Sequence, residues 1–218
     1  MNGKSSGCVL CENPYTGAIT PTKLTDRSRF GNDGVFSNIT QVQLPSGLWV
    51  YSCNGSNSAI LPGKTMQELG CYKDFTYYVW CKTAIIGSTR YMMGTSIAGG
   101  ANMCDLGQTS AGNYVFYVNT GAGAAITLSS SVPAMVWRQV VGTYDGTNQS
   151  IYVNGLFDNS SGNTGMLDTT ANYALGQPGE YVGLWFSGLL AIPRILNRAL
   201  SPAEIRTSFQ NERAFFGV

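Results

Sequence analysis

The sequence predicts an all-β domain in which two antiparallel sheets pack face to face as a sandwich, followed by one short C-terminal helix. Residues 136–156 predict two short strands and a turn, and the second strand alternates Ile151 and Val153 with Tyr152 and Asn154. Glycine is abundant, with 27 residues, and only 11% of residues are charged. This composition is typical of a β-sandwich with polar loops and argues against a coiled coil or a disordered chain.

The elements follow in chain order. Residues 1–24 are predicted to form an N-terminal arm or edge strand, and residues 25–218 one sandwich domain. Strands are expected where apolar residues recur between turn signals, at residues 35–36, 48–61 (two strands around an Asn-Gly turn), 75–83, 90–94, 114–119, 125–128, 173–175 and 187–196. The predicted core includes Phe75, Val79, Trp137, Val141, Ile151 and Val153.

The C-terminal helix has the clearest local signal in the chain. Ser201 is placed as the N-cap, Pro202 at the first helical position and Glu204 at the third, which makes a capping box. The residues that follow can sustain two or three turns. No repeat or linker divides the chain, so we expect a single domain.

Charge and hydropathy exclude several classes of partner. The net charge is +1 with no basic run, which gives no footprint for nucleic acid or for an acidic membrane surface. No segment has the length of a membrane span. The amino terminus has no apolar core of signal-peptide length, so we expect synthesis in the cytoplasm without a recognisable secretory signal.

The six cysteines are expected to be mostly reduced, because no secretory signal is recognisable. Cys53 and Cys81 lie within apolar strand-like runs and are interpreted as small buried hydrophobic residues. Cys8 and Cys11 form a Cys-x-x-Cys motif, which could be half of a zinc knuckle or a redox pair. The other cysteines lack the spacing of a second zinc half-site, and a redox motif normally opens a helix in an α/β fold.

Five sequence blocks, in order, resemble the LamG-like branch of the concanavalin A-like lectin/glucanase superfamily. They are the Asn-Asp-Gly loop at residues 26–34, the strand pair at 48–62, Phe-Thr to Trp at 75–80, Trp then Gly-Thr-Tyr-Asp-Gly then Tyr-Val-Asn-Gly at 137–155, and Phe-Ser-Gly to Asn-Arg-Ala-Leu-Ser at 186–201. The resemblance covers about residues 26–213 and implies a concanavalin A-like jelly roll. Two departures are Arg138, where the family often has His, and Ala191-Ile192, where it often has acidic residues.

The loop at residues 26–34 is the candidate metal site. Asp26, Asn32 and Asp33 offer the hard oxygen ligands that calcium prefers. The alternative is that these residues only hold Asx-turns. In relatives that bind calcium, one acid of the closing strand often helps to hold the ion, and Ala191 removes it here. Calcium is the one cofactor that the sequence suggests.

Aromatic side chains are the candidates for binding a glycan. Trp185 and Tyr181 lie with Phe186 in a loop flanked by glycine, where they could face solvent. Trp80 and Trp137 lie on predicted strands and are expected in the core.

Catalysis has little support in the sequence. The chain contains no histidine, which excludes Ser-His-Asp and Cys-His mechanisms. Its glutamates are scattered, and no strand carries the paired carboxylates of a glycoside hydrolase. If turnover were found, Asp145, Asp158 and Asp168 would be examined first. We therefore expect a protein that is not an enzyme.

Three functions remain open from the sequence. The first is a recognition or structural module displayed on a virion, as a phage capsid decoration or attachment protein with weak glycan binding. The second is a carbohydrate-binding domain cut from a larger secreted or cell-surface protein, and the third is a diverged glycoside hydrolase. The first two imply a glycan or a surface protein as partner, a location on a virion or extracellular surface, and display as an oligomer or in many copies.

Overall fold

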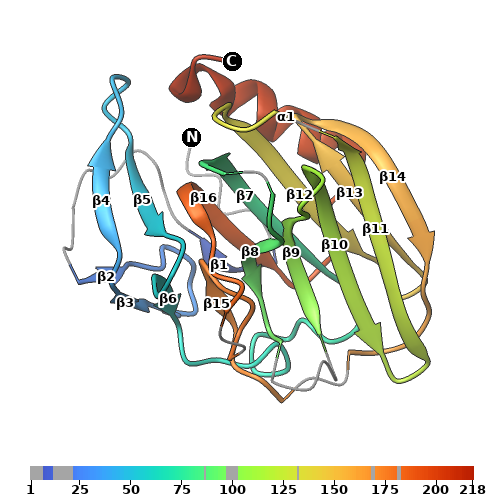
Figure 1. Cartoon of the computed structure of the whole chain (residues 1–218). Coiled ribbons are helices and arrows are strands. Elements are labelled where there is room, and N and C mark those ends of the chain that lie inside the picture. The colour runs from blue at the N-terminus through green and yellow to red at the C-terminus, as the bar shows by residue number, and fades with distance from the viewer. Residues whose placement is uncertain are drawn as a thin grey trace.

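The computed structural model describes residues 7–11, 22–85, 87–96, 103–131, 133–167, 170–180 and 183–218. In these residues, two sheets of eight strands each pack face to face, and one α-helix lies near the C-terminus (Figure 1). Neighbouring strands within each sheet run antiparallel. The predicted two-sheet antiparallel sandwich is thereby confirmed.

Sheet A has the strand order β14-β13-β12-β7-β16-β5-β4, and β1 pairs with the second half of β16. Its strands are β1 (Cys8–Cys11), β4 (Thr40–Gln43), β5 (Trp49–Asn54), β7 (Phe75–Thr83), β12 (Arg138–Tyr144), β13 (Asn148–Val153), β14 (Leu156–Gly162) and β16 (Ser187–Leu196). The predicted hairpin at residues 136–156 is formed by β12 and β13.

Sheet B has the strand order β11-β10-β9-β8-β15-β6-β3-β2. Its strands are β2 (Lys23–Leu24), β3 (Gly34–Ser37), β6 (Ala59–Leu61), β8 (Arg90–Gly94), β9 (Cys104–Gln108), β10 (Asn113–Thr120), β11 (Gly123–Ser131) and β15 (Ala174–Leu175). The arm at residues 1–24 thus contributes β1 to one sheet and β2 to the other.

The main core lies between the sheets and is rich in aromatic rings. Phe75 on β7 of sheet A packs edge-on against Phe116 on β10 of sheet B, with ring centroids 5.9 Å apart. Tyr77 contacts both Phe116 and Tyr173. Of the predicted core residues, Phe75, Val79 and Ile151 are fully buried in this layer, and Val153 packs against it.

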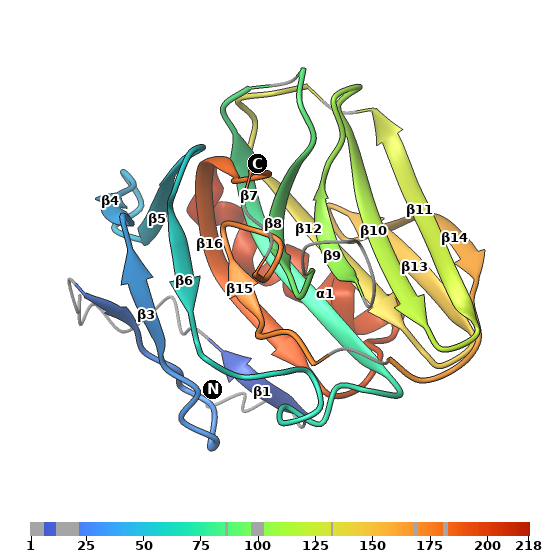
Figure 2. The ribbon, with the colours of Figure 1, turned by 60° about the horizontal axis from the view of Figure 1, so that its bottom comes forward.

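A second core covers the opposite face of sheet A. Trp137 and Val141 are buried as predicted, but they lie in this second layer and not between the sheets. The reason is the alternation of β12, in which Val140 points inward and its neighbour Val141 points outward. The side chains of α1 (Pro202–Glu212) and of the following 3-10 helix η1 (Arg213–Phe216) contribute to this layer. Figure 2 shows α1 on the side of sheet A that faces away from sheet B.

The terminal helices are fastened to sheet A by rings and by one buried carboxylate. Trp80 on β7 stacks on Phe216 at 4.1 Å between ring centroids. Glu212, at the end of α1, accepts hydrogen bonds from the Tyr78 hydroxyl at 2.5 Å and from Trp80 Nε1 at 2.7 Å, and it pairs with Arg194 Nη2 at 2.6 Å.

The predicted capping box is present at the start of α1. The Ser201 hydroxyl accepts from the Glu204 backbone N–H, and Glu204 accepts from the Ser201 backbone N–H at 2.9 Å. Within the described part of the chain, neither helix has the length and apolar character needed to cross a membrane.

Candidate functional site

The 26–34 loop, predicted as a calcium site, is organised around the buried carboxylate of Asp26. Its Oδ1 accepts from the backbone N–H groups of Cys11 at 2.9 Å and Ser28 at 2.8 Å. Its Oδ2 accepts from the Ser28 hydroxyl at 2.6 Å and the Asn32 backbone N–H at 2.7 Å. Four donors use the lone-pair positions of this carboxylate, so Asp26 has none to offer a metal without rearrangement.

The two other predicted ligands are also engaged. Asn32 Nδ2 donates to the carbonyl of Val9 at 2.6 Å. Asp33 Oδ1 accepts from the Asp26 backbone N–H, and Asp33 Oδ2 pairs with Lys23 Nζ at 2.6 Å, a contact that lowers the pKa of the Asp33 carboxyl. Calcium needs about six to eight oxygen ligands, so the loop as folded does not fit the ion, and calcium binding here stays a prediction.

The same loop holds strand β1 against the sandwich. Asn32 Nδ2 donates to the Val9 carbonyl, and the Arg27 backbone N–H donates to the Cys11 carbonyl at 2.8 Å. On its other side, β1 pairs with β16, and Val9 is buried in the main core. The loop therefore holds β1 in place through hydrogen bonds.

The cysteines divide into one disulfide and four buried thiols. Cys8 and Cys11 are joined by a disulfide within β1. Cys53 and Cys81 are free and buried, as predicted, and burial raises the pKa of each thiol to about 12. Such thiols are protonated at neutral pH and unreactive. Among the residues that the structure describes, no three His, Cys, Asp or Glu side chains gather as a metal site.

Trp185, predicted as a glycan-binding residue, lies beside β8 of sheet B. Its backbone forms an isolated parallel bridge with Tyr91, and the Tyr91 N–H donates to the Leu184 carbonyl at 3.1 Å. Residues paired in this way point to the same side of a sheet. Trp185 is partly exposed, whereas its neighbour Phe186 is fully buried in the main core. Tyr181, the other predicted residue, lies outside the described residues.

Tyr91 places Trp185 on the outer face of sheet B, the side that points away from sheet A. Two cross-strand rows on β8 to β11 belong to this face. One row is Tyr91, Gly107, Val115 and Leu128, and the other is Gly94, Asp105, Tyr117 and Ile126. We call Tyr91, Tyr117 and Trp185 the aromatic face. Each is partly exposed, and Ile126 beside them is 55% exposed.

Asp105 is buried beneath this face. Its Oδ1 accepts from the Thr95 backbone N–H at 3.0 Å, and its Oδ2 accepts from the Ser96 hydroxyl. Gly94, opposite on β8, makes room for the carboxyl, because a Cβ there would overlap it. Burial raises the pKa of Asp105 to about 7, and Tyr91 next to it also has its pKa raised to about 12, first by burial and then by Asp105.

Sequence reasoning missed Tyr91, Tyr117 and Asp105. Asp105 has a detectable signal: it is a charged residue that alternates with apolar Cys104 and Leu106 in a short strand. That pattern places it alone on the face opposite the core. Tyr91 has no such signal, because its position follows from the bridge to Trp185, which is distant in the sequence.

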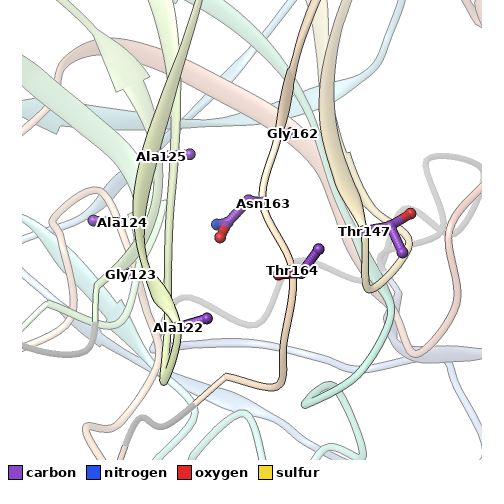
Figure 3. Close-up of a pocket in the computed structure, with 8 residues that line it drawn as sticks. All are labelled: Ala122, Gly123, Ala124, Ala125, Thr147, Gly162, Asn163 and Thr164. Carbon is purple, nitrogen blue, oxygen red and sulfur yellow. The ribbon is translucent and has the colours of Figure 1, made fainter.

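A shallow groove of about 350 Å³ opens at the edge of the sandwich, between β11 and the end of β14 (Figure 3). Its eight lining residues are small or polar: Ala122, Gly123, Ala124, Ala125, Thr147, Gly162, Asn163 and Thr164. The Asn163 side chain is already engaged, since its Nδ2 donates to the Val118 carbonyl at 2.9 Å and its Oδ1 accepts from the Thr120 hydroxyl. The groove has no aromatic ring among its lining residues and is the weaker candidate for a ligand.

Of the three carboxylates named for catalysis, the structure describes two, Asp145 and Asp158, and each accepts hydrogen bonds from nearby backbone. Asp145 accepts from the backbone N–H groups of Thr147 and Asn148, which makes it an Asx-turn residue. Asp158 accepts from the Ser130 backbone N–H across to β11 at 2.9 Å. Asp168 lies outside the described residues.

Comparison with known families places this β-sandwich. The family model described as concanavalin A-like lectin/glucanases superfamily, Laminin_G_3, matches residues 54–206. The chain therefore belongs to this superfamily, as its sequence landmarks predicted. A comparison with curated proteins yields no significant match.

Several solved structures share the fold. The binding domain of Paraclostridial Mosquitocidal Protein 1 has a TM-score of 0.76 at 17% identity, over 97% of this chain and 55% of that one. Domain 4 of AbnA, an extracellular arabinanase from Geobacillus stearothermophilus in complex with arabinotriose, has a TM-score of 0.65 at 19% identity, over 84% and 91%. Trypanosoma rangeli sialidase in complex with sialic acid has a TM-score of 0.70 at 19% identity, over 97% and 34%.

The coverage differs between these structures. The chain spans about half the length of the toxin binding domains, namely 55% for the mosquitocidal protein and 54% for a botulinum neurotoxin C/D mosaic receptor binding domain. It spans 91% of the arabinanase domain. At these low identities the likeness establishes the fold.

Proposed function

We propose that this chain is a non-catalytic glycan-binding module of a larger secreted or cell-surface protein, and that it binds sugar on the outer face of sheet B. The observation that carries the proposal is the aromatic face. Tyr91, Tyr117 and Trp185 come from three separate segments, yet the register of sheet B brings them to one side as partly exposed rings.

Partly exposed rings on a rigid sheet suit the recognition of sugars. The C–H faces of a sugar ring stack on aromatic rings, and the hydroxyl groups need polar partners nearby. The Tyr91 and Tyr117 side chains supply both a ring and a hydroxyl group. Because the sheet already holds their backbones in place, little conformational entropy is lost on binding.

Membership of a lectin and glucanase superfamily supports the same reading, and so does the arabinotriose-bound domain among the structures of this fold. Display on a virion, as a capsid decoration or attachment protein, has no comparable support. Single-site affinity is expected to be weak, so retention on a glycan surface would depend on several copies or on neighbouring domains.

The proposal that the module does not catalyse rests on its carboxylates. Asp26, Asp145 and Asp158 accept backbone N–H groups, and Glu204 and Glu212 pair with arginines. A glycoside hydrolase needs two carboxyl groups that face the scissile bond. The third hypothesis, a diverged hydrolase, therefore has little support, even though sialidases are among the structures of similar fold.

The direct test is a panel of immobilised oligosaccharides probed with the purified chain and with a Tyr91→Ala plus Trp185→Ala variant. Tyr72→Ala serves as the matched control, because Tyr72 is 45% exposed and lies outside the aromatic face. Loss of both rings should weaken binding by at least about tenfold, since each stacked ring contributes about 1 kcal/mol or more, and the control should bind like the wild type.

Three outcomes would overturn the proposal. The first is that no glycan on the panel is retained by the wild-type chain. The second is that the double variant binds as tightly as the wild type, which would move the site elsewhere. The third is release of reducing ends during incubation, which would restore the hydrolase reading.

A further inference from the structure

The strands that build the aromatic face are almost free of charge. Between Arg90 and Arg138 the sequence has one charged residue, Asp105, and no Lys, Arg or Glu. This stretch contains β9, β10, β11 and nearly all of β8. The segment that carries Trp185 is also uncharged from residue 181 to residue 193.

The one charged residue within this stretch is not available as an ion at the surface. Asp105 is fully buried, and its two oxygens accept from Thr95 and Ser96. What the face offers to a ligand is therefore rings, hydroxyl groups and apolar side chains. Tyr91, Tyr117 and Trp185 supply the rings, and Ile126 and Leu128 are the large exposed aliphatic residues beside them.

Arg90 is the cation nearest in sequence to the face, but it points elsewhere. It pairs with Gln108 on β9, one position away from the Tyr91–Gly107 pair, so its side chain leaves the sheet on the opposite side. Its Nη1 donates to the carbonyl of Gly55 in the β5–β6 turn, at 3.5 Å. Arg90 is thus not positioned to bind an anion on the outer face.

A sugar acid bound at such a face would have no partner for its carboxylate. Proteins hold carboxylates with Arg or Lys, or with converging N–H groups, and an unpaired anion that loses its water is strongly disfavoured. A neutral sugar has no such requirement. Its hydroxyl groups can keep water or bond to the tyrosine hydroxyls while its ring stacks.

From these observations we infer that the aromatic face selects neutral glycans and excludes acidic ones, such as sialylated or uronic acid-containing chains. This inference rests on the proposed function and specifies its ligand class. Binding should depend little on ionic strength, because no ion pair contributes to it.

The experiment compares matched neutral and acidic oligosaccharides that differ only by a carboxylate, for example galactose-terminated and sialylated forms of one chain, or glucose and glucuronic acid oligomers. The wild-type chain should bind the neutral member at least about tenfold more tightly. Its affinity for the neutral member should change less than about twofold between about 50 and 500 mM salt.

A gain-of-function variant sharpens the test. Ile126→Lys adds a cation beside Tyr117 at a position that is already 55% exposed, so it should not disturb folding. It should raise the affinity for the acidic member by about three- to tenfold, in a salt-dependent manner. Val42→Lys, at a 42% exposed position on β4 of the other sheet, is the matched control and should change nothing.

The outcomes separate this inference from the proposed function. Tighter wild-type binding of the acidic member, lost on mutation of Tyr91 and Trp185, would overturn neutral selectivity and leave glycan binding intact. Failure of every glycan to bind would overturn the proposed function itself. Equal affinity for the neutral and the acidic member would overturn the inference. Weaker self-association of Ile126→Lys than of the wild type would also overturn it, because the face would then be a contact between copies of the chain.

Discussion

Replacement of Glu212 by alanine should be among the most damaging single substitutions in the chain. Its side chain is 8% exposed and that of its partner Arg194 is 20% exposed. Removing one member of a buried ion pair costs about 3–5 kcal/mol, because the remaining charge is left without a partner. The Tyr78 hydroxyl and Trp80 Nε1 would also lose their acceptor, so the total loss is expected to be about 5 kcal/mol.

That loss is large compared with the stability of a domain, which is about 5–15 kcal/mol. For a chain of this size each kcal/mol shifts Tm by about 2–4 °C, so Glu212→Ala should melt about 10–20 °C below the wild type. The Tm of Glu212→Gln should lie between those of Glu212→Ala and the wild type, since the glutamine amide oxygen can still accept from Tyr78 and Trp80. Glu68→Ala, at a carboxylate whose side chain is 51% exposed, is the control.

Thermal and urea unfolding, followed by near-ultraviolet circular dichroism, would measure these differences. The near-ultraviolet signal is well suited to follow the docking of the terminal helices, because Trp80 stacks on Phe209 and Phe216 beneath them. If Glu212→Ala and Glu68→Ala melted within about 3 °C of each other, the buried pair would not be what fastens α1 to sheet A.

Three further predictions follow from the titratable groups and from β1. Burial raises the pKa of Asp105 from 3.8 to about 7. The stability that its protonated carboxyl contributes is therefore fully present below about pH 4 and is lost as the pH rises through 7. Asp105→Asn should flatten the resulting fall in Tm between these two pH values. Excess calcium should raise the wild-type Tm by less than about 2 °C over chelator, because Asp26 is already saturated with hydrogen bonds; a larger shift that disappears in Asp26→Ala plus Asp33→Ala would establish the calcium site. A dithiol reductant should lower Tm by about 4–8 °C through loss of the small Cys8–Cys11 loop, and a variant with both cysteines changed to serine should not respond to it.

Much of the fold could be predicted from the sequence, because a strong alternation of side chains between two faces predicts a strand. The run at residues 75–83 became β7, and the hairpin at 136–156 became β12 and β13. Two of the strands that were missed have weak signals. β14 is polar and mostly exposed, and β9 is interrupted by Asp105 and Gly107, residue types that are depleted in strands.

Which face a residue occupies was harder to predict than whether it is buried. Trp137 and Val141 are buried, yet in a second layer that exists only because α1 docks on sheet A. β7 is buried on both sides, so its alternation cannot show which side faces the other sheet. The docking of α1 depends on contacts such as Glu212 with Arg194, which are distant from β7 in the sequence.

The candidate site was predicted only in part for a similar reason. Trp185 was found as an aromatic residue in a loop flanked by glycine. Tyr91, which pairs with Trp185, and Tyr117 come from β8 and β10, and sheet register alone brings the three residues to one side of the sheet. The 26–34 loop was recognised as a cluster of oxygen donors, but the sequence could not show that those donors hold β1.

The central claim, that a glycan binds at the aromatic face, is tested most directly by the indole N–H signals in a heteronuclear NMR titration. The chain has four tryptophans, and among them Trp80 and Trp137 are buried beneath the terminal helices. A neutral oligosaccharide that binds should shift the Trp185 indole signal and leave those of Trp80 and Trp137 in place. Binding that leaves Trp185 unchanged, and shifts backbone signals at Ala124 and Thr164 in the edge groove, would contradict the account.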